Sequence, residues 1–369
     1  MKKSNSEVRK IFFLYKTPRT KIYKEWLKGL SPDTILYGAN HFEKLGFKVF
    51  FSDFSYSPLN IFHWIFYPIQ YVAAKRTGIG FKLDQALVHL LSFRKNSLIV
   101  STMDTVGLPL LLLKKLKILK STLIYISVGL ADKIENNPRK WPFHWYKELL
   151  KHADIIICYS KPEERLLKQL NKNVYFLPVG IDFKFFQRKT KFKGPKSDKP
   201  VIIAFGRDQD RDYNTFITAI KGKNVKGIIV ASRENLKGIA IPSNVKVYHD
   251  LPAAELKKKI LLSDIVVIPI KKVKKAAGQL SLLDALACEK PVIISKIYSI
   301  TESFGLKDYF HNLYYFPEKP ESLWEKLEFL INNPNEARKI AANGQKLAKR
   351  YSTEAFANNL LEIINRVSE

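Results

Sequence analysis

Two arginines in the middle of the chain have the spacing and the setting to bind a diphosphate. In the stretch PVIIAFGRDQDRDYNTF, an apolar run typical of a β-strand ends at Gly206, and Arg207 and Arg211 follow it. A diphosphate carries about two negative charges, and a guanidinium group offers a planar, permanently charged fork to its oxygens. The sequence therefore predicts an anion site here. The alternative is a set of surface ion pairs with the aspartates between 208 and 212, which would stabilise the fold little.

A second anion-binding element is predicted where AAGQLSLLDALACEKPV follows the lysine-rich loop KKVKK. Gly278 permits close approach of a ligand to the backbone, and the amides of Gln279, Leu280 and Ser281 begin a helix. Free N–H groups at a helix N-terminus attract anions. Asp284 lies farther along the same helix. It is either a ligand-binding carboxylate or a solvated helix residue.

Metal and thiol chemistry are not indicated. The two cysteines, Cys158 and Cys288, each lie inside an apolar run, which favours small buried side chains over ligands or nucleophiles. The seven histidines are scattered without HxxxH spacing. We therefore expect no metal and no other cofactor.

Short β-branched runs alternate with helical stretches along the whole chain. The runs in the first half are RKIFFLY, FKVFFS, SLIVST, STLIYIS, ADIIICYS and NVYFLP, and those in the second half are PVIIAFG, KGIIVAS, NVKVYH, SDIVVIPI, KPVIIS and NLYYFP. Runs that are apolar on both faces are typical of parallel strands covered by helices on both sides. The pattern predicts an α/β fold with two Rossmann-like, doubly wound domains in series.

The domain boundary is predicted in the polar, lysine-rich stretch FQRKTKFKGPKSDKP, residues 186–200, whose composition is typical of a linker. The N-terminal domain would then comprise residues 1–185 and the C-terminal domain residues 201–350. We expect residues 351–369 to form a final helix that packs back toward the N-terminal domain, with a cap at Ser352 and Thr353.

Three ordered blocks resemble the large group 1 (family 4-like) superfamily of retaining GT-B glycosyltransferases. They are PVIIAFGRDQDRDYNTFITAI, NVKVYHDLPAAELKKKILLSDIVVIPI and AAGQLSLLDALACEKPVIIS, and VGIDFKFF is similar to the segment that closes the family's N-terminal domain. The resemblance implies two Rossmann-like domains that face each other across a cleft. It also implies transfer of a sugar from a nucleotide-diphosphate-sugar, such as a UDP- or GDP-sugar, to a hydroxyl acceptor.

The resemblance assigns roles to the donor-side residues. Arg207 matches the family's diphosphate-binding arginine, Asp212 stands where the family has a lysine, and Arg211 lies one position away from it. Asp284 matches the acidic residue that accepts hydrogen bonds from the ribose. Ala276 stands where the family has a sugar-binding glutamate, so we expect backbone amides of 277–280 and the Gln279 side chain to bind the sugar instead.

The N-terminal half is expected to bind the acceptor and to complete the catalytic site. Lys16 and Arg19 follow the first strand, where the family has a glycine-rich turn. Asp104, Ser127 and Asp132 lie beyond the third and fourth strands, at the sheet edge where doubly wound folds bind ligands. We take Arg207, Arg211, Asp104 and Ser127 as catalytic candidates, although the family's histidine near Ser127 is absent. Catalysis by positioning and charge stabilisation does not require an obvious base.

The strongly basic composition points to an anionic partner. The formal net charge is +28, and residues 1–200 carry 36 Lys and Arg against 15 Asp and Glu, a net +21. The segment PLNIFHWIFYPIQYVAAKRTGIGFK combines aromatic side chains with flanking cations. It is either a buried core helix or a helix in the interface of an anionic membrane, which would suit a lipid-linked acceptor or a membrane-surface glycan.

No run is long and apolar enough for a transmembrane helix, and the N-terminal apolar run is too short for a secretory signal. We therefore expect a cytoplasmic protein that is either free or peripheral on the membrane. Two other functions stay open: a nucleotide-sugar-binding protein or epimerase of the same fold, and a nucleic-acid-binding protein. No known nucleic-acid-binding motif supports the second. The oligomeric state is not indicated.

Overall fold

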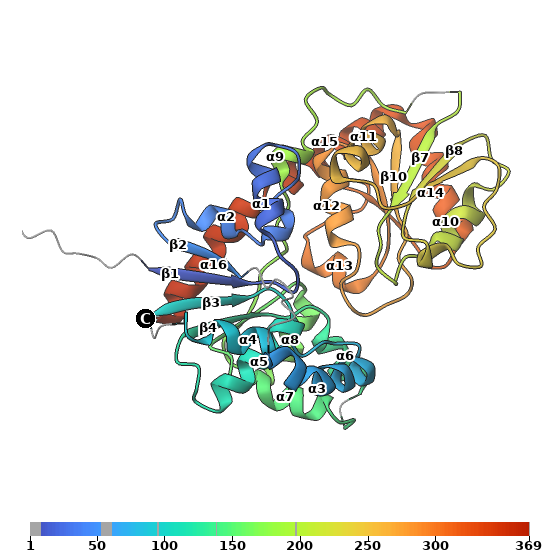
Figure 1. Ribbon diagram of the computed structural model, residues 1–369. Coiled ribbons are helices and arrows are strands. Elements are labelled where there is room, and N and C mark those ends of the chain that lie inside the picture. The colour runs from blue at the N-terminus through green and yellow to red at the C-terminus, as the bar shows by residue number, and fades with distance from the viewer. Residues whose placement is uncertain (1–8, 53–60, 94–95, 138, 196–197, 369) are drawn as a thin grey trace, which may run out of the picture. The chain divides into compact units, whose positions relative to one another are not determined.

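The computed structural model describes residues 9–52, 61–93, 96–137, 139–195 and 198–368. The chain folds into two compact units (Figure 1). Unit 1 contains residues 1–27, 35–178 and 356–369, and unit 2 contains residues 28–34 and 179–355. The stretch 186–200 belongs to unit 2, where Phe186 and Phe192 are buried.

Unit 1 is built on a six-stranded parallel sheet with the order β2-β1-β3-β4-β5-β6. The strands are β1 (Lys10–Leu14), β2 (Lys48–Ser52), β3 (Ser97–Ser101), β4 (Thr122–Ile126), β5 (Ile155–Cys158) and β6 (Val174–Phe176). The helices are α1 (Thr20–Leu27), α2 (Ala39–Phe42), α3 (Ile61–Thr77), α4 (Leu83–Leu90), α5 (Asp104–Lys115), α6 (Leu130–Asn136), α7 (Phe143–Leu150) and α8 (Lys161–Lys168).

Alternate strand residues build the two core layers of unit 1. Phe12 and Leu14 pack in the layer that includes α5 and α7, whereas Ile11 and Phe13 pack in the layer that includes α2. The second layer also takes in α16 (Thr353–Ser368), whose buried residues include Leu360. Because side chains of a strand point alternately to opposite faces, a strand covered on both sides must be apolar throughout.

Unit 2 repeats this architecture with the strand order β12-β11-β10-β7-β8-β9, again all parallel. The strands are β7 (Val201–Phe205), β8 (Lys226–Val230), β9 (Val245–Tyr248), β10 (Ile265–Ile268), β11 (Val292–Ser295) and β12 (Leu313–Tyr315). The helices are α9 (Phe183–Phe186), α10 (Tyr213–Ile220), α11 (Ala253–Leu262), α12 (Gln279–Ala287), α13 (Tyr298–Ser303), α14 (Pro320–Asn332) and α15 (Pro334–Lys349).

The structure confirms the predicted α/β class, and all twelve runs predicted as strands contain one. In each sheet the chain reverses its direction of winding once, between β1 and β3 in unit 1 and between β7 and β10 in unit 2. Ligands of doubly wound sheets bind at the carboxyl ends of the strands beside such a reversal. We therefore expect ligand-binding sites at these two sheet edges.

None of the helices in the described part of the chain is both long and apolar enough to span a bilayer.

Candidate functional site

The loop after β7 crosses the carboxyl end of β10, the strand beside it at the reversal. The amide of Asp212 donates to the carbonyl of Pro269 at 3.0 Å, and the amide of Lys271 donates to the carbonyl of Asp210 at 2.8 Å. Arg211 and Ile270 form an antiparallel bridge between the two segments. Backbone pairing therefore fixes the position of Arg211 at the reversal in unit 2.

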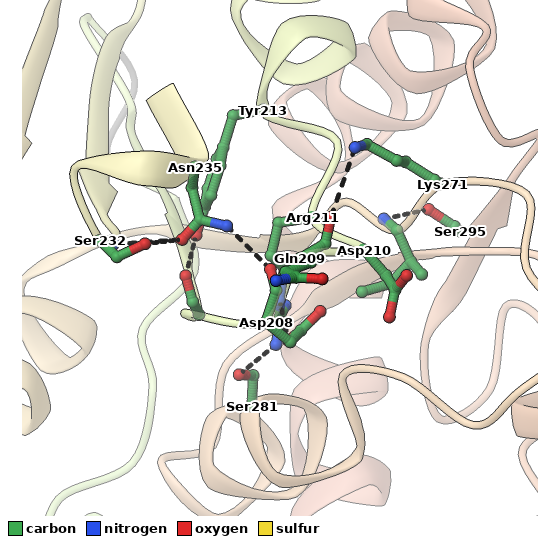
Figure 2. Close-up of polar contacts among 12 residues, drawn as sticks. Asp208, Gln209, Asp210, Arg211, Tyr213, Ser232, Asn235, Lys271, Ser281 and Ser295 are labelled. Carbon is green, nitrogen blue, oxygen red and sulfur yellow. Dashed lines mark hydrogen bonds and ion pairs between the residues drawn. The ribbon is translucent and has the colours of Figure 1, made fainter. Parts of the chain in front are cut away.

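The guanidinium group of Arg211 lies against the first turn of α12 (Figure 2). The residue is only 5% exposed. Its Nε donates to Asp208 Oδ2 at 2.6 Å and its Nη2 donates to Ser281 Oγ at 2.8 Å. Its Nη1 is buried and has no hydrogen-bond partner within the described residues. A buried cationic donor without a partner is costly, so this nitrogen is suited to bind an anion.

The backbone around Arg211 is shaped for this arrangement. Gly206 has φ 142°, and a Cβ at this position would overlap the Arg211 guanidinium. The hydroxyl of Tyr213 donates to the Gly206 carbonyl at 2.7 Å. Asn235 Nδ2 donates to the Asp208 carbonyl at 2.8 Å, as Figure 2 shows. Hydrogen bonds from neighbouring elements thus hold the loop on both sides of the arginine.

The N-terminus of α12 is the second part of the candidate site. Gly278 caps the helix with φ 79°, and a Cβ at this position would lie 2.9 Å from Ile270 Cδ1, so glycine is required here. Gln279 and Ser281 are buried, whereas Leu280 is partly exposed. The first amides of α12 and the Arg211 guanidinium therefore occupy one small region, as expected for an anion site.

Asp284 lies one turn farther along α12. Burial, and to a smaller extent the negative charge of Asp182, raise the pKa of its carboxyl well above the ordinary value. Its Oδ1 is buried and has no hydrogen-bond partner in the described part of the chain. This carboxyl group can therefore accept a hydrogen bond from a bound hydroxyl group, and the ribose-binding role that the family resemblance implies for it stays a prediction.

Arg207 differs sharply from Arg211. Its Nη2 lies 3.6 Å from Asp250 Oδ1 in an ion pair whose side chains are 57% and 72% exposed. Asp212, which stands where the family has a lysine, caps α10 by accepting from the Thr215 amide at 3.1 Å. Of the basic pair predicted from the sequence, only Arg211 is buried at the reversal.

The acceptor-side candidates lie in unit 1, beyond the carboxyl ends of β1, β3 and β4. The Lys16 carbonyl accepts from Lys82 Nζ at 3.1 Å, and the Arg19 guanidinium lies over the Tyr15 ring with its centroid 5.7 Å away. Asp132 lies in the first turn of α6 and is partly exposed. These residues follow different strands but occupy the same edge of the sheet.

Asp104 and Tyr125 form a buried pair beside them. The Tyr125 hydroxyl donates to Asp104 Oδ1 at 2.5 Å, and the Val128 amide donates to the same oxygen at 3.2 Å. Burial raises the pKa of Asp104 to about 6, although these hydrogen bonds oppose the shift. Asp104 therefore joins the end of β3 to the loop after β4.

Glu163 is a residue that the sequence interpretation missed. Its Oε1 accepts from Ser127 Oγ at 2.7 Å, and burial followed by the charge of nearby carboxylates raises its pKa to about 7. The Glu163 amide donates to Ser160 Oγ at 3.4 Å at the start of α8. The sequence SKPE has the S-x-x-E spacing of a capping box, which would have placed this carboxylate at the helix start.

Within the described residues, no group of three or more His, Cys, Asp and Glu side chains is arranged to hold a metal ion. Cys158 and Cys288 are buried free thiols.

Residues 186–347 match the family model "Glycosyl transferases group 1". An uncharacterized glycosyltransferase of Methanocaldococcus jannaschii is 20% identical over 235 residues. That alignment spans 61% of this chain and 63% of the relative's length.

Several solved structures share the fold over nearly the whole chain. Anabaena HepE in complex with UDP-glucose has a TM-score of 0.67 at 14% identity, covering 97% of this chain and 99% of HepE. Sucrose-phosphate synthase of Thermosynechococcus elongatus has a TM-score of 0.70 at 15% identity, with the same two coverages. The α,α-trehalose-phosphate synthase of Burkholderia vietnamiensis has a TM-score of 0.68 at 10% identity, covering 97% and 98%.

The fold is therefore the GT-B fold, with two parallel six-stranded sheets flanked by helices. The family match over residues 186–347 lies in the half of the chain that carries Arg211 and α12. The family match and the fold are both similar to those of glycosyltransferases.

Proposed function

We propose that the protein transfers a sugar from a nucleotide-diphosphate-sugar to a hydroxyl acceptor, with retention of anomeric configuration. One observation carries this proposal: the buried Arg211 guanidinium lies beside the first turn of α12, and its Nη1 has no partner among the described residues. A preorganised cation next to a helix N-terminus stabilises the negative charge that develops on a diphosphate leaving group.

A UDP-sugar is the first donor to test. HepE has the same fold, and its solved structures contain UDP-glucose or UDP. In the proposed complex, Arg211 and the amides of residues 278–281 bind the diphosphate, and Asp284 accepts hydrogen bonds from the ribose. Because Ala276 has no polar side chain, the Gln279 side chain and nearby amides bind the sugar. Arg207 is exposed, so its positive charge attracts the donor more weakly than that of Arg211.

In a retaining transfer the acceptor hydroxyl attacks the face from which the diphosphate departs. The bond between the anomeric carbon and the diphosphate oxygen breaks, and this oxygen leaves with the nucleoside diphosphate. A new bond forms between the anomeric carbon and the acceptor oxygen, and the hydroxyl proton passes to the departing diphosphate. Positioning and charge stabilisation provide most of the catalysis in such a step. We expect the reaction to proceed without a metal ion.

The acceptor is proposed to bind at the sheet edge of unit 1. Asp104, Ser127 and Asp132 lie there, and Lys16 and Arg19 supply positive charge. Glu163 adds a carboxyl group that accepts a hydrogen bond from Ser127. The net charge of +21 in residues 1–200 favours an acceptor at an anionic surface, so we propose a lipid-linked acceptor or a membrane-surface glycan. The protein would then be cytoplasmic and peripheral on the membrane.

A screen of thermal unfolding against UDP-, GDP-, ADP- and dTDP-sugars tests the donor proposal. A ligand at about 100 times its Kd stabilises the folded state by about 2.7 kcal/mol, which raises the unfolding temperature measurably. The selected donor is then incubated with and without candidate lipid-linked acceptors. NMR of the product gives its anomeric configuration, and an inverted product would refute the proposed retention.

A second candidate is a nucleotide-sugar-binding protein or an epimerase of the same fold. Ala276 favours it, because the family's sugar-binding carboxylate is absent at this position. Epimerisation or hydrolysis of the donor in the absence of any acceptor would support this alternative over transfer.

A further inference from the structure

Helix α3 of unit 1 leaves most of its apolar surface uncovered. Among its residues 63–77, for which burial is described, His63, Ala73 and Thr77 are buried and form a narrow stripe. The large side chains around them are 41–62% exposed. They are Trp64, Ile65, Tyr67, Ile69, Tyr71 and Val72, and with Trp141, which is 57% exposed, we call them the aromatic patch.

The aromatic patch exposes much more apolar area than a single hydrophobic residue on a protein surface does. An aromatic side chain can bury roughly 150–250 Å², so Trp64, Tyr67 and Tyr71 alone expose about 300 Å² at their observed exposures. The three exposed aliphatic side chains add to this area. An apolar patch of a few hundred Å² is comparable to the largest patch on a typical monomeric protein, and such patches are often functional.

Cations border the aromatic patch. Lys75 and Arg76 end α3 and are exposed, and the Arg76 guanidinium lies over the Trp141 ring with its centroid 5.2 Å away. Arg139 and Lys140, just before Trp141, are exposed as well. The Arg76 contact therefore joins the end of α3 to the loop between α6 and α7, and Figure 1 shows where these helices lie in unit 1.

The positive charge of this region favours an anionic partner over a second copy of the chain. Residues 54–83 contain no Asp or Glu, and the three Lys and Arg residues in this segment are Lys75, Arg76 and Lys82. A second copy of the chain would bring the same cations against themselves and would be repelled. An anionic bilayer attracts them, and Trp and Tyr favour the interface between headgroups and acyl chains.

We infer that the aromatic patch docks the protein on an anionic membrane surface, with the exposed side of α3 in the interface and the flanking cations on the headgroups. The position of α3 is set within unit 1 independently of any membrane. Lys133 Nζ, from α6, donates to the Thr77 carbonyl at 2.7 Å, and His63 Nδ1 lies 2.9 Å from Asp84 Oδ2 of α4. The helix is therefore anchored along its buried stripe while its opposite side is available for binding.

Flotation of the full chain with lipid vesicles tests this inference. We expect binding to phosphatidylcholine vesicles that contain phosphatidylglycerol, weaker binding to pure phosphatidylcholine, and release at high salt. The variant Ile65→Ser/Ile69→Ser should bind at least about tenfold more weakly because it removes exposed apolar area. Lys75→Gln/Arg76→Gln should weaken binding to the anionic vesicles by about 30-fold.

The chain offers a matched control. Leu116 and Ile118 of unit 1 are 56% and 49% exposed, close to the 58% and 56% of Ile65 and Ile69. Leu116→Ser/Ile118→Ser should float like the wild type. Quenching of Trp64 fluorescence by brominated lipid, measured as the difference from Trp64→Phe, reports contact with the acyl region directly.

The inference is overturned if the wild type does not float with anionic vesicles at low salt, or if the patch variant and the control float equally. Sedimentation of the wild type as a dimer that Ile65→Ser/Ile69→Ser makes monomeric, without flotation, would assign the patch to self-association instead. The inference extends the proposed function by naming the surface that would bring the enzyme to a lipid-linked acceptor. Because flotation uses neither donor nor acceptor, it succeeds or fails independently of sugar transfer.

Discussion

Arg211 gives the sharpest test of the donor site. Its Nε and Nη2 are already bound to Asp208 and Ser281, so its buried Nη1 is the nitrogen left to bind a ligand phosphate. One hydrogen bond that involves a charged group contributes about 1.5–3 kcal/mol. Arg211→Gln should therefore raise the Kd for the nucleoside diphosphate roughly 10- to 100-fold.

The same reasoning ranks other substitutions. Arg207→Gln should change the Kd less than about fivefold, because its exposed side chain contributes at most about 1 kcal/mol. Arg211→Lys keeps the charge but loses the planar fork that binds two partners at once, so its effect should be intermediate. Arg366→Gln makes the same charge change at an exposed residue of α16 in unit 1 and is the control, with an unchanged Kd.

Isothermal titration measures these constants for the nucleoside diphosphate and for the corresponding nucleoside. Arg211→Gln should weaken the diphosphate selectively, because the nucleoside has no group for Nη1. Urea unfolding is measured in parallel, since the substitution also removes a partner of Asp208. A folded variant with wild-type diphosphate affinity, or one that loses nucleoside and diphosphate affinity equally, would refute the role given to Arg211.

Three further predictions follow from local geometry. Gly278→Ala should cost clearly more stability in urea than Gly222→Ala: both have positive φ, about 1–2 kcal/mol of strain for an added Cβ, but only Gly278 has a neighbour within 4 Å. The pKa of Glu163 is raised from 4.5 to about 7, so between these values the folded state holds a proton that the unfolded state has released. The resulting stability is fully present below pH 4.5 and falls by about 3 kcal/mol up to pH 7. Glu163→Gln should flatten this fall in urea titrations, whereas Glu164→Gln should not. Gln279→Ala should raise the donor KM if its side chain binds the sugar, and an unchanged KM would exclude that role.

The strands and the fold class were predictable because buried parallel strands are apolar without interruption. ADIIICYS and SDIVVIPI contain β5 and β10, in which every residue is buried. No polar periodicity was needed to recognise them, and their alternation with helices indicated two doubly wound sheets. The fold is confirmed. Retention, the acceptor and membrane binding stay predictions.

The arrangement of the site was less accessible from the sequence. Arg207 and Arg211 are alike in type and lie in one loop, yet one is more than half exposed and the other is buried. The difference arises from contacts with Ile270 and Ser281, which are distant in sequence. Glu163 was missed for a related reason: its contact with Ser127 joins the ends of two strands, and only its helix-capping pattern is local.

The departure of this chain from the family pattern gains a physical explanation at Arg211. The family has a lysine at the position of Asp212, whereas here Asp212 caps α10 and the cation lies one residue earlier. An ammonium group has no fork that can bind Asp208 and Ser281 in fixed directions while a third nitrogen stays available. A guanidinium group can bind both Asp208 and Ser281 and still leave a third nitrogen for a ligand. Arg211 therefore connects the loop after β7 to α12 and is also the proposed phosphate ligand. Loss of diphosphate affinity and loss of rigidity in this loop should appear together in Arg211→Gln. Both losses should be only partial in Arg211→Lys.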